Sequence, residues 1–142
     1  MDSEARIGPV TAADRDFWFT LDKHLSGAAF DRLVREGTGY VLSVDGAPAG
    51  LLRYSLFWGE IPFCDMLYIR PDCRRQGLGR ALMARWMADM KARGCDLALT
   101  STQSDEPAQH FYRALGFTDC GGFILPFPGH EQPLELILGR AL

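Results

Sequence analysis

A strand-like run and an amphipathic helical pattern lie close together in the middle of this chain. Residues 61–69 (IPFCDMLYI) are mostly apolar, and Pro62 stands near their start, where a missing N–H donor is tolerated. Residues 72–75 have the composition of a loop, and residues 78–93 then repeat apolar side chains at helical spacing. The chain must therefore fold so that a helix begins almost directly after a strand ends.

The flanking segments complete a mixed pattern of strands and helices. Hydrophobic periodicity and turn residues predict these further elements: a strand over 6–10, a helix that begins after Thr11 and is broken at Gly27, a shorter helix that ends at Gly37, two strands joined at Asp45-Gly46, a strand over 95–102, a helix that stops at Gly116, and two last strands over 117–127 and 133–142 that pair antiparallel. This order predicts one α/β domain over residues 1–142, built around a single mixed sheet of six to seven strands with about four helices.

Composition argues against nucleic acid, a metal site and a membrane span. The charged content of 23% is ordinary for a soluble globular protein, and the net charge of −3 gives no reason to expect a nucleic-acid partner. The four cysteines form no CxxC pair and no zinc-site spacing, which predicts reduced thiols and no metal site. The N-terminal residues do not have the pattern of a signal peptide, and no apolar run is long enough for a membrane helix. We therefore expect a cytoplasmic protein.

Arginines and glycines concentrate where the expected helix begins. Arg74, Arg75 and Arg80 surround Gly77 and Gly79. The first turn of a helix leaves N–H groups unpaired, and glycines let a bulky anion approach them. One interpretation of this segment is that it binds a small phosphorylated ligand. The other is that it is only a tight connection between the strand and the helix, with its arginines in solvent. A Walker loop is excluded because no GK[ST] follows, and a dinucleotide fingerprint is excluded because no third glycine follows.

Two segments resemble motifs of one enzyme family. LYIRPDCRRQGLGRALM contains Q/R-x-x-G-x-G/A, and SDEPAQHFYRALGF resembles N-x-x-A-x-x-F-Y-x-x-x-G-F. These are similar to motifs A and B of the GNAT superfamily of N-acetyltransferases. The matching residues are Arg74, Gly77, Gly79, Ala108, Phe111, Tyr112, Gly116 and Phe117. Asp105 departs from the pattern, since asparagine is usual there.

The resemblance implies a GNAT-like sheet that splays between its fourth and fifth strands and takes acetyl-CoA as a co-substrate. Backbone groups of the fourth strand would bind the pantetheine arm, and amides of residues 76–80 would bind the diphosphate. The implied cofactor-binding residues are Leu67, Tyr68, Ile69, Arg74, Arg75, Gln76, Gly77, Leu78, Gly79, Arg80, Asp105 and Tyr112. Asp105 would lie near the pantetheine or acetyl end, because its charge would repel phosphates, or it would cap the helix.

The implied reaction is direct attack of a primary amine, on a small molecule or peptide, at the thioester. Tyr112 would then be the acid that assists the leaving thiolate, unless it is only a packing residue. Asp65 lies on the fourth strand in alternation with Phe63, Leu67 and Ile69, and it is the first candidate for the base. Glu60 is the second candidate, and either carboxylate is alternatively structural.

The sequence identifies the residues that would bind the acceptor less specifically than those that would bind acetyl-CoA. The resemblance implies a pocket lined from the first two helices, the fourth-strand region and the last hairpin, and its aromatic residues are alternatively core. The residues in question are Phe17, Trp18, His24, Phe57, Trp58, Phe123, Phe127 and His130. The competing hypotheses are a non-catalytic acyl-CoA-binding module and a structural domain. A monomer and a homodimer both remain open, the latter through LELIL as an exposed edge.

Overall fold

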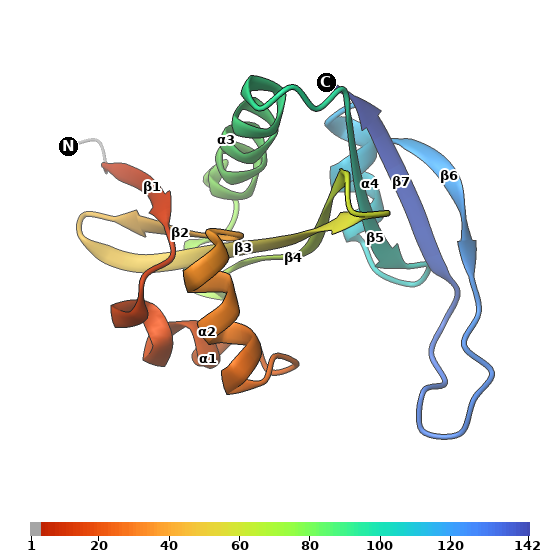
Figure 1. Ribbon diagram of the computed structural model, residues 1–142, viewed down its shortest axis with the longest axis horizontal. Helices are drawn as coiled ribbons and strands as arrows, with labels where there is room; N and C mark the ends of the chain where they lie inside the picture. The colour runs from red at the N-terminus through yellow and green to blue at the C-terminus, as the bar shows by residue number, and fades with distance from the viewer. Residues whose placement is uncertain (1–3) are drawn as a thin grey trace. The chain divides into compact units, whose positions relative to one another are not determined.

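Seven strands form one sheet in the order β1-β2-β3-β4-β5-β7-β6, in a computed structural model that describes residues 4–142 (Figure 1). The strands are β1 (Ala5–Pro9), β2 (Gly39–Val44), β3 (Ala47–Phe57), β4 (Ile61–Ile69), β5 (Leu97–Gln103), β6 (Thr118–Phe123) and β7 (Glu135–Ala141). The helices are η1 (Ala12–Asp14), α1 (Arg15–Leu21), α2 (Gly27–Glu36), η2 (Pro71–Cys73), α3 (Leu78–Ala92) and α4 (Ala108–Ala114). β4 and β5 pair in parallel over two residue pairs, whereas β5 and β7 pair antiparallel over seven. The predicted mixed α/β fold is confirmed.

The chain folds as two compact units, Met1–Ser55 with Asp65–Met87, and Leu56–Cys64 with Ala88–Leu142. In the first unit, α1 and α2 lie on one side of the strands and α3 lies on the other (Figure 1). The core beneath α1 and α2 is formed by Val10, Trp18, Phe30, Leu33, Val41 and Leu51. Burying a side chain such as Leu51, which is fully inaccessible, contributes about 1.5–3 kcal/mol.

The first helix ends earlier than predicted. α1 stops at Leu21, because the next residue, Asp22, is fully buried and accepts hydrogen bonds from Trp18 Nε1 at 3.1 Å and Arg53 Nε at 2.8 Å. Gly27 does not break a helix but begins α2, because Ser26 Oγ accepts from the Ala29 amide at 3.1 Å and caps that end. The predicted end of α2 is confirmed by Gly37, whose φ of 69° suits a C-terminal glycine.

The Asp45-Gly46 turn between β2 and β3 is also confirmed. Asp45 has φ of 50° and Gly46 has φ of 83°, the two positive angles that a type I′ hairpin turn requires.

β7 is an interior strand of the second unit. It pairs with β5 along one side and with β6 along the other, so the expectation that LELIL forms an exposed edge is wrong. The edge is β6 instead, and its pairing with β7 shifts register between Asp119 and Gly122. Such an irregularity disrupts the row of N–H and C=O groups that another chain would need for pairing.

Residues 4–142 contain no helix that combines the length and apolar composition needed to cross a membrane. No group of three or more His, Cys, Asp or Glu side chains among them is arranged to hold a metal ion.

Candidate functional site

The segment between β4 and α3 is held in place by two arginines. Arg70 donates twice to the Asp72 carboxylate, from Nε to Oδ1 at 3.1 Å and from Nη2 to Oδ2 at 2.7 Å. Its Nη1 also donates to the Pro48 carbonyl at 3.2 Å. Arg74 donates from Nε to the Ile69 carbonyl at 3.0 Å, and its guanidinium lies 4.9 Å from the centre of the Tyr68 ring. Arg74, a predicted cofactor ligand, therefore fastens the turn to the end of β4.

The backbone after Arg74 alternates in handedness. Arg75 and Gly77 have φ of 64° and 76°, while Gln76 between them does not have a positive φ. A left-handed conformation at a residue other than glycine costs on the order of 1–3 kcal/mol, so the fold imposes this shape on Arg75. Alternation of this kind turns successive N–H groups toward one concave side and produces an anion-binding nest.

The amides of this nest have no hydrogen-bond partner among residues 4–142. Ala81 N donates to the Gly77 carbonyl at 3.0 Å in the first turn of α3, whereas no acceptor in the described chain bonds the N–H groups of residues 76–80. A Cβ placed on Gly77 would meet no atom within 4 Å, so the space beside it is open. These groups lie at the positive end of a helix of 15 residues, where an anion gains about 0.3–1 kcal/mol.

Two arginines add charge beside these amides. Arg75 and Arg80 are exposed, and neither forms an ion pair with any residue in the described part of the chain. Gln76 and Gly77 are exposed as well, whereas Leu78 is buried and offers only its backbone. The turn thus has unpaired amides, open space and two arginines without ion-pair partners among the described residues. These features suit the binding of a diphosphate.

Asp65 lies on β4 in the same unit. The residue is exposed, but partial burial of its carboxyl raises the pKa, while the Ser55 hydroxyl and the Arg53 guanidinium lower it. A raised pKa makes a carboxylate a stronger base near neutral pH.

The predicted alternation of Asp65 with Ile69 on one face is wrong. Asp65 faces Ser55, whereas Ile69 Cδ1 lies against Gly50, and Ser55 and Gly50 belong to opposite faces of β3. The β3–β4 pairing must therefore include an extra residue between these two points.

Tyr112 lies on α4 in the second unit. Its side chain is buried and contacts the rings of Phe111 and Phe117, with centroids 5.3 and 5.7 Å away. Burial raises the pKa of Tyr112 well above its usual value of 10.0; Cys64 and Glu106 act in the same direction, and a hydrogen bond with Thr100 opposes them. The phenol is therefore protonated near neutral pH and can donate a hydrogen bond.

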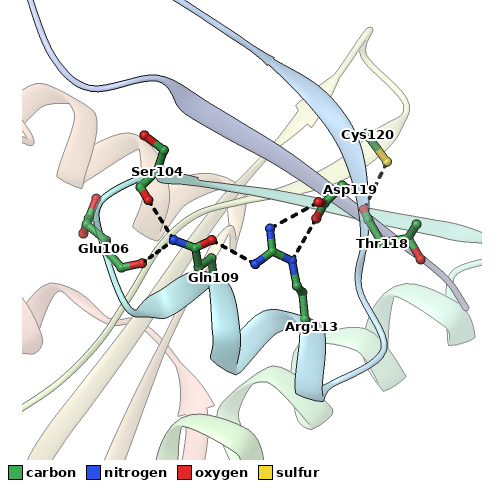
Figure 2. Close-up of polar contacts among 7 residues, drawn as sticks. All are labelled: Ser104, Glu106, Gln109, Arg113, Thr118, Asp119 and Cys120. Carbon is green, nitrogen blue, oxygen red and sulfur yellow. Dashed lines mark hydrogen bonds and ion pairs between the residues drawn. The ribbon is translucent and has the colours of Figure 1, made fainter.

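A chain of side-chain bonds fixes the helix that carries Tyr112 (Figure 2). Gln109 Nε2 donates to the carbonyls of Ser104 at 2.8 Å and Glu106 at 3.1 Å. Its Oε1 accepts from Arg113 Nη1 at 2.8 Å, and Arg113 donates from Nε and Nη2 to Asp119 at 3.0 and 3.2 Å. The chain ties the β5–α4 loop, α4 and β6 together, and we call it the α4 clamp.

The remaining candidates differ in their surroundings. Glu60 lies in the exposed β3–β4 turn, where its amide donates to the Phe57 carbonyl at 3.1 Å. Asp105 is exposed and does not cap α4: that helix has Pro107 at its N-cap position and no side-chain cap bond.

The aromatic residues of the expected acceptor pocket fall into two groups. Trp18 is fully buried, and its Nε1 donates a hydrogen bond to Asp22. The expectation that Trp18 lines the acceptor pocket is therefore wrong. Four others are exposed in the second unit, namely Phe57, Trp58, Phe123 and Phe127.

Two features were missed by sequence reasoning. Thr100 is a fully buried polar residue bonded to the Cys64 carbonyl at 3.1 Å, and the sequence does not distinguish it from Ser101, Thr102 and Gln103, which follow it in β5. The α4 clamp had no signal either, because glutamine and arginine on a short helix are ordinary surface residues.

Comparison with known proteins agrees with these features. The acetyltransferase (GNAT) family matches residues 8–117. A structure of Ard1 from Thermoplasma volcanium superposes with a TM-score of 0.85 at 16% identity, covering 97% of both chains. The ribosomal-protein-S18-alanine N-acetyltransferase of Escherichia coli superposes with a TM-score of 0.82 at 19% identity, covering 97% of this chain and 94% of that one.

A third structure contains the donor molecule. A GNAT family acetyltransferase from Elizabethkingia anophelis with acetyl-CoA bound superposes with a TM-score of 0.75 at 18% identity, covering 97% of this chain and 98% of that one. No curated protein sequence matches this chain. The family match covers well over half of the sequence and includes both the Arg74–Gly79 turn and Tyr112, and so the chain belongs to the acetyltransferase (GNAT) family.

Proposed function

We propose that this protein transfers the acetyl group of acetyl-CoA to a primary amine of a small molecule or peptide by direct attack. The observation that carries the proposal is the nest at residues 75–80, where unpaired amides, the open space at Gly77 and the exposed Arg75 and Arg80 offer a site for a diphosphate. We assign the whole chain, 1–142, to one acetyltransferase domain, because the family match contains segments of both units.

Each predicted ligand has a defined part in donor binding. The amides of residues 76–80, including those of Leu78 and Gly79, hold the diphosphate, and Arg75 and Arg80 neutralise it. Arg74 acts through the turn that it fastens. The backbone groups of Leu67, Tyr68 and Ile69 pair with the pantetheine amides, and Asp105 lies toward the acetyl end.

The reaction forms a C–N bond and breaks the C–S bond, and the electron pair of the C–S bond leaves with sulfur. An alkyl ammonium has a pKa near 10.4, so removing its proton near pH 7 costs roughly 4–5 kcal/mol. Asp65 takes this proton, because burial raises its pKa and so makes it a stronger base than an aspartate in water.

Tyr112 stabilises the leaving sulfur. A thiol ionises near pH 8.5, well below the pKa of this buried phenol, so complete proton transfer from Tyr112 to the thiolate is uphill. Tyr112 therefore acts by donating a hydrogen bond to the sulfur as negative charge develops there.

Two measurements test the proposed function. Acetyl-CoA at 100 times its dissociation constant should stabilise the fold by about 2.7 kcal/mol, which a thermal shift detects. Release of CoA thiol should then be found with at least one member of a panel of small amines and short peptides with free N-termini. A thermal shift without thiol release would favour the acyl-CoA-binding module, and the absence of both would favour a purely structural domain.

Substitution of Tyr112 by phenylalanine tests the assignment of the hydrogen-bond donor. We expect kcat to fall by about 10²-fold, as happens when one transition-state donor is removed, with little change in acetyl-CoA affinity. Steady-state kinetics and calorimetry measure the two quantities separately. A Tyr112→Phe enzyme that turns over at the original rate would remove Tyr112 from the mechanism.

A further inference from the structure

A buried carboxylate holds Arg53 of β3 in one orientation. Asp22, the residue after α1, has no exposed surface, and its Oδ2 accepts from Arg53 Nε at 2.8 Å and from Trp18 Nε1 at 3.1 Å. Its Oδ1 accepts from the His24 amide at 3.3 Å. Both oxygens of this carboxylate are therefore bonded, and the Arg53 side chain is fixed at its Nε end.

The other end of the Arg53 guanidinium faces solvent. The N–H groups on Nη1 and Nη2 have no acceptor among residues 4–142. These nitrogens are not sealed from water, because Trp86 Nε1 is the only fully buried side-chain nitrogen or oxygen without a partner in the described chain. The Arg53 side chain is 18% exposed. Its outer edge can therefore donate two parallel hydrogen bonds to a carboxylate that arrives from solution.

Arg53 lies beside the strand that carries the proposed base. Its bond to Asp22 places it on the side of the sheet that carries α1 and α2, and Met66 and Tyr68 of the neighbouring strand β4 pack against the core beneath the same helices. Asp65 precedes Met66 in β4, and the positive charge of Arg53 lowers the pKa of its carboxyl. Asp22 is nevertheless the only ion-pair partner of Arg53 among residues 4–142. A positive and a negative group thus stand on adjacent strands without being paired with each other.

We propose that Arg53 binds a carboxylate of the acceptor, and that the acceptor is an amino acid or another amine with a carboxylate a few bonds away. The proposal rests on the proposed function, which brings the amine to Asp65. The ammonium and carboxylate groups of such a molecule are complementary in charge to Asp65 and Arg53. Adjacent strands are about 4.8 Å apart, and this spacing limits the number of bonds between the two groups.

The buried ion pair between Asp22 and Arg53 contributes position to this site. A buried ion pair is weak evidence for stability, because apolar residues of similar volume often replace one without loss. Here Asp22 restrains Nε, so the outer edge of the guanidinium stays directed toward solvent. A carboxylate is then bound with a smaller loss of side-chain freedom than an unrestrained arginine would suffer.

Matched pairs of acceptors test the role of Arg53. Each pair is a common amino acid and its carboxamide, which keeps the amine and the side chain but lacks the negative charge. We expect kcat/KM for the amino acid that reacts fastest, relative to its amide, to fall about tenfold in Arg53→Lys, at unchanged KM for acetyl-CoA. Lysine keeps a positive charge beside Asp22 but lacks the planar pair of donors.

Arg85→Lys is the matched control. Arg85 is an exposed arginine of α3, on the other side of the sheet, and its Nη1 donates to the Ile7 carbonyl at 3.1 Å. This variant should keep the original ratio. An unchanged ratio in Arg53→Lys, or the same fall in both variants, would overturn the proposal.

Peptides distinguish the two sources of the carboxylate. A peptide that begins with aspartate or glutamate offers a side-chain carboxylate near its amine, whereas a free amino acid offers its α-carboxylate. Preference for such peptides over those that begin with asparagine or glutamine, lost in Arg53→Lys, would assign the side-chain carboxylate to Arg53. Faster reaction of amines without any carboxylate than of every amino acid and every acidic peptide would contradict the proposal and leave the proposed function standing.

A spectroscopic measurement tests the site without turnover. In protein labelled with ¹⁵N at arginine, the Nε resonance of Arg53 is identified by its loss in Arg53→Lys. With CoA present, we expect at least one amino acid of the panel to shift this resonance and its amide to leave it in place. A resonance that no amino acid moves would contradict the site. A shift without release of thiol from acetyl-CoA would support the site and count against the proposed function instead.

Discussion

Asp65 and Asp72 lie in the same unit and have pKa values shifted in opposite directions. Burial raises the pKa of Asp65, whereas the hydrogen bond from Arg70 lowers that of Asp72. Folding therefore favours the protonated form of Asp65 and the ionised form of Asp72. The two side chains should contribute to stability with opposite dependence on pH.

Denaturant unfolding of two asparagine variants measures these contributions. Asp65→Asn should be more stable than the original protein at pH 7, with a difference that disappears as the pH falls through the raised pKa toward 3.8. Asp72→Asn should be less stable at pH 7, and its deficit should shrink as the pH falls below 3.8 through the lowered pKa. A common sign for the two variants at pH 7 would contradict the assigned environments.

Asp65→Asn also distinguishes the two candidates for the general base. If Asp65 takes the proton of the amine, Asp65→Asn should lower kcat/KM and abolish the acidic limb of its pH profile. Glu60→Gln should leave both unchanged, because Glu60 lies in an exposed turn. The reverse result, with the limb lost only in Glu60→Gln, would transfer the role to Glu60.

At the scale of elements, α4 depends on its tertiary contacts. A helix of seven residues is too short to be stable alone, and it lacks a side-chain cap at its N-terminus. The α4 clamp supplies the stabilising hydrogen bonds that a cap would otherwise provide, because Gln109 alone bonds two loop carbonyls and Arg113. The orientation of Tyr112 follows from these bonds.

Removal of Gln109 should loosen α4 selectively. We expect Gln109→Ala to lower the free energy of unfolding by about 1 kcal/mol and to speed amide hydrogen exchange in α4 and the β5–α4 loop. Gln132→Ala is the matched control, since Gln132 lies in the β6–β7 connection and donates to Glu135 at the start of β7 at 2.9 Å. Equal exchange in α4 for the two variants would show that the clamp does not hold the helix.

At the scale of the whole molecule, the chain is slightly acidic, with a net charge of −3, yet it presents uncommitted arginines at the nest. Attraction of an anion to exposed arginines is screened when salt shortens the Debye length from about 10 Å at 0.1 M to about 3 Å at 1 M. CoA affinity should therefore fall as salt increases, and the affinity of acetyl-pantetheine, which lacks the diphosphate, should not. Parallel salt dependence of the two ligands in calorimetry would argue against a phosphate site.

The sequence predicted those features that local patterns determine. The strand over Ile61–Ile69, the start of α3 and the Asp45-Gly46 turn follow from periodicity and glycine positions, and all three were found. The order of the expected elements predicted the mixed fold, and the family resemblance supplied the acetyltransferase class. The roles assigned to individual site residues remain predictions.

The errors in the predicted fold arose where contacts between residues far apart in the sequence determine the structure. α1 ends at Leu21 because the next residue, Asp22, forms an ion pair with Arg53, which lies 31 positions further along the chain. β7 is interior because β5 and β6 flank it, and no local pattern contains that pairing.

Calorimetry of CoA binding to a matched pair of variants tests the nest most directly. Asn and Asp are similar in size and both tolerate the positive φ of Gly77, so Gly77→Asn and Gly77→Asp differ chiefly by one negative charge. We expect the original protein to bind CoA, Gly77→Asn to bind more weakly, and Gly77→Asp to lose at least a further tenfold in affinity, or about 1.4 kcal/mol. Equal CoA affinity in all three proteins, or no heat of binding in any of them at millimolar CoA, would contradict a diphosphate bound at residues 75–80.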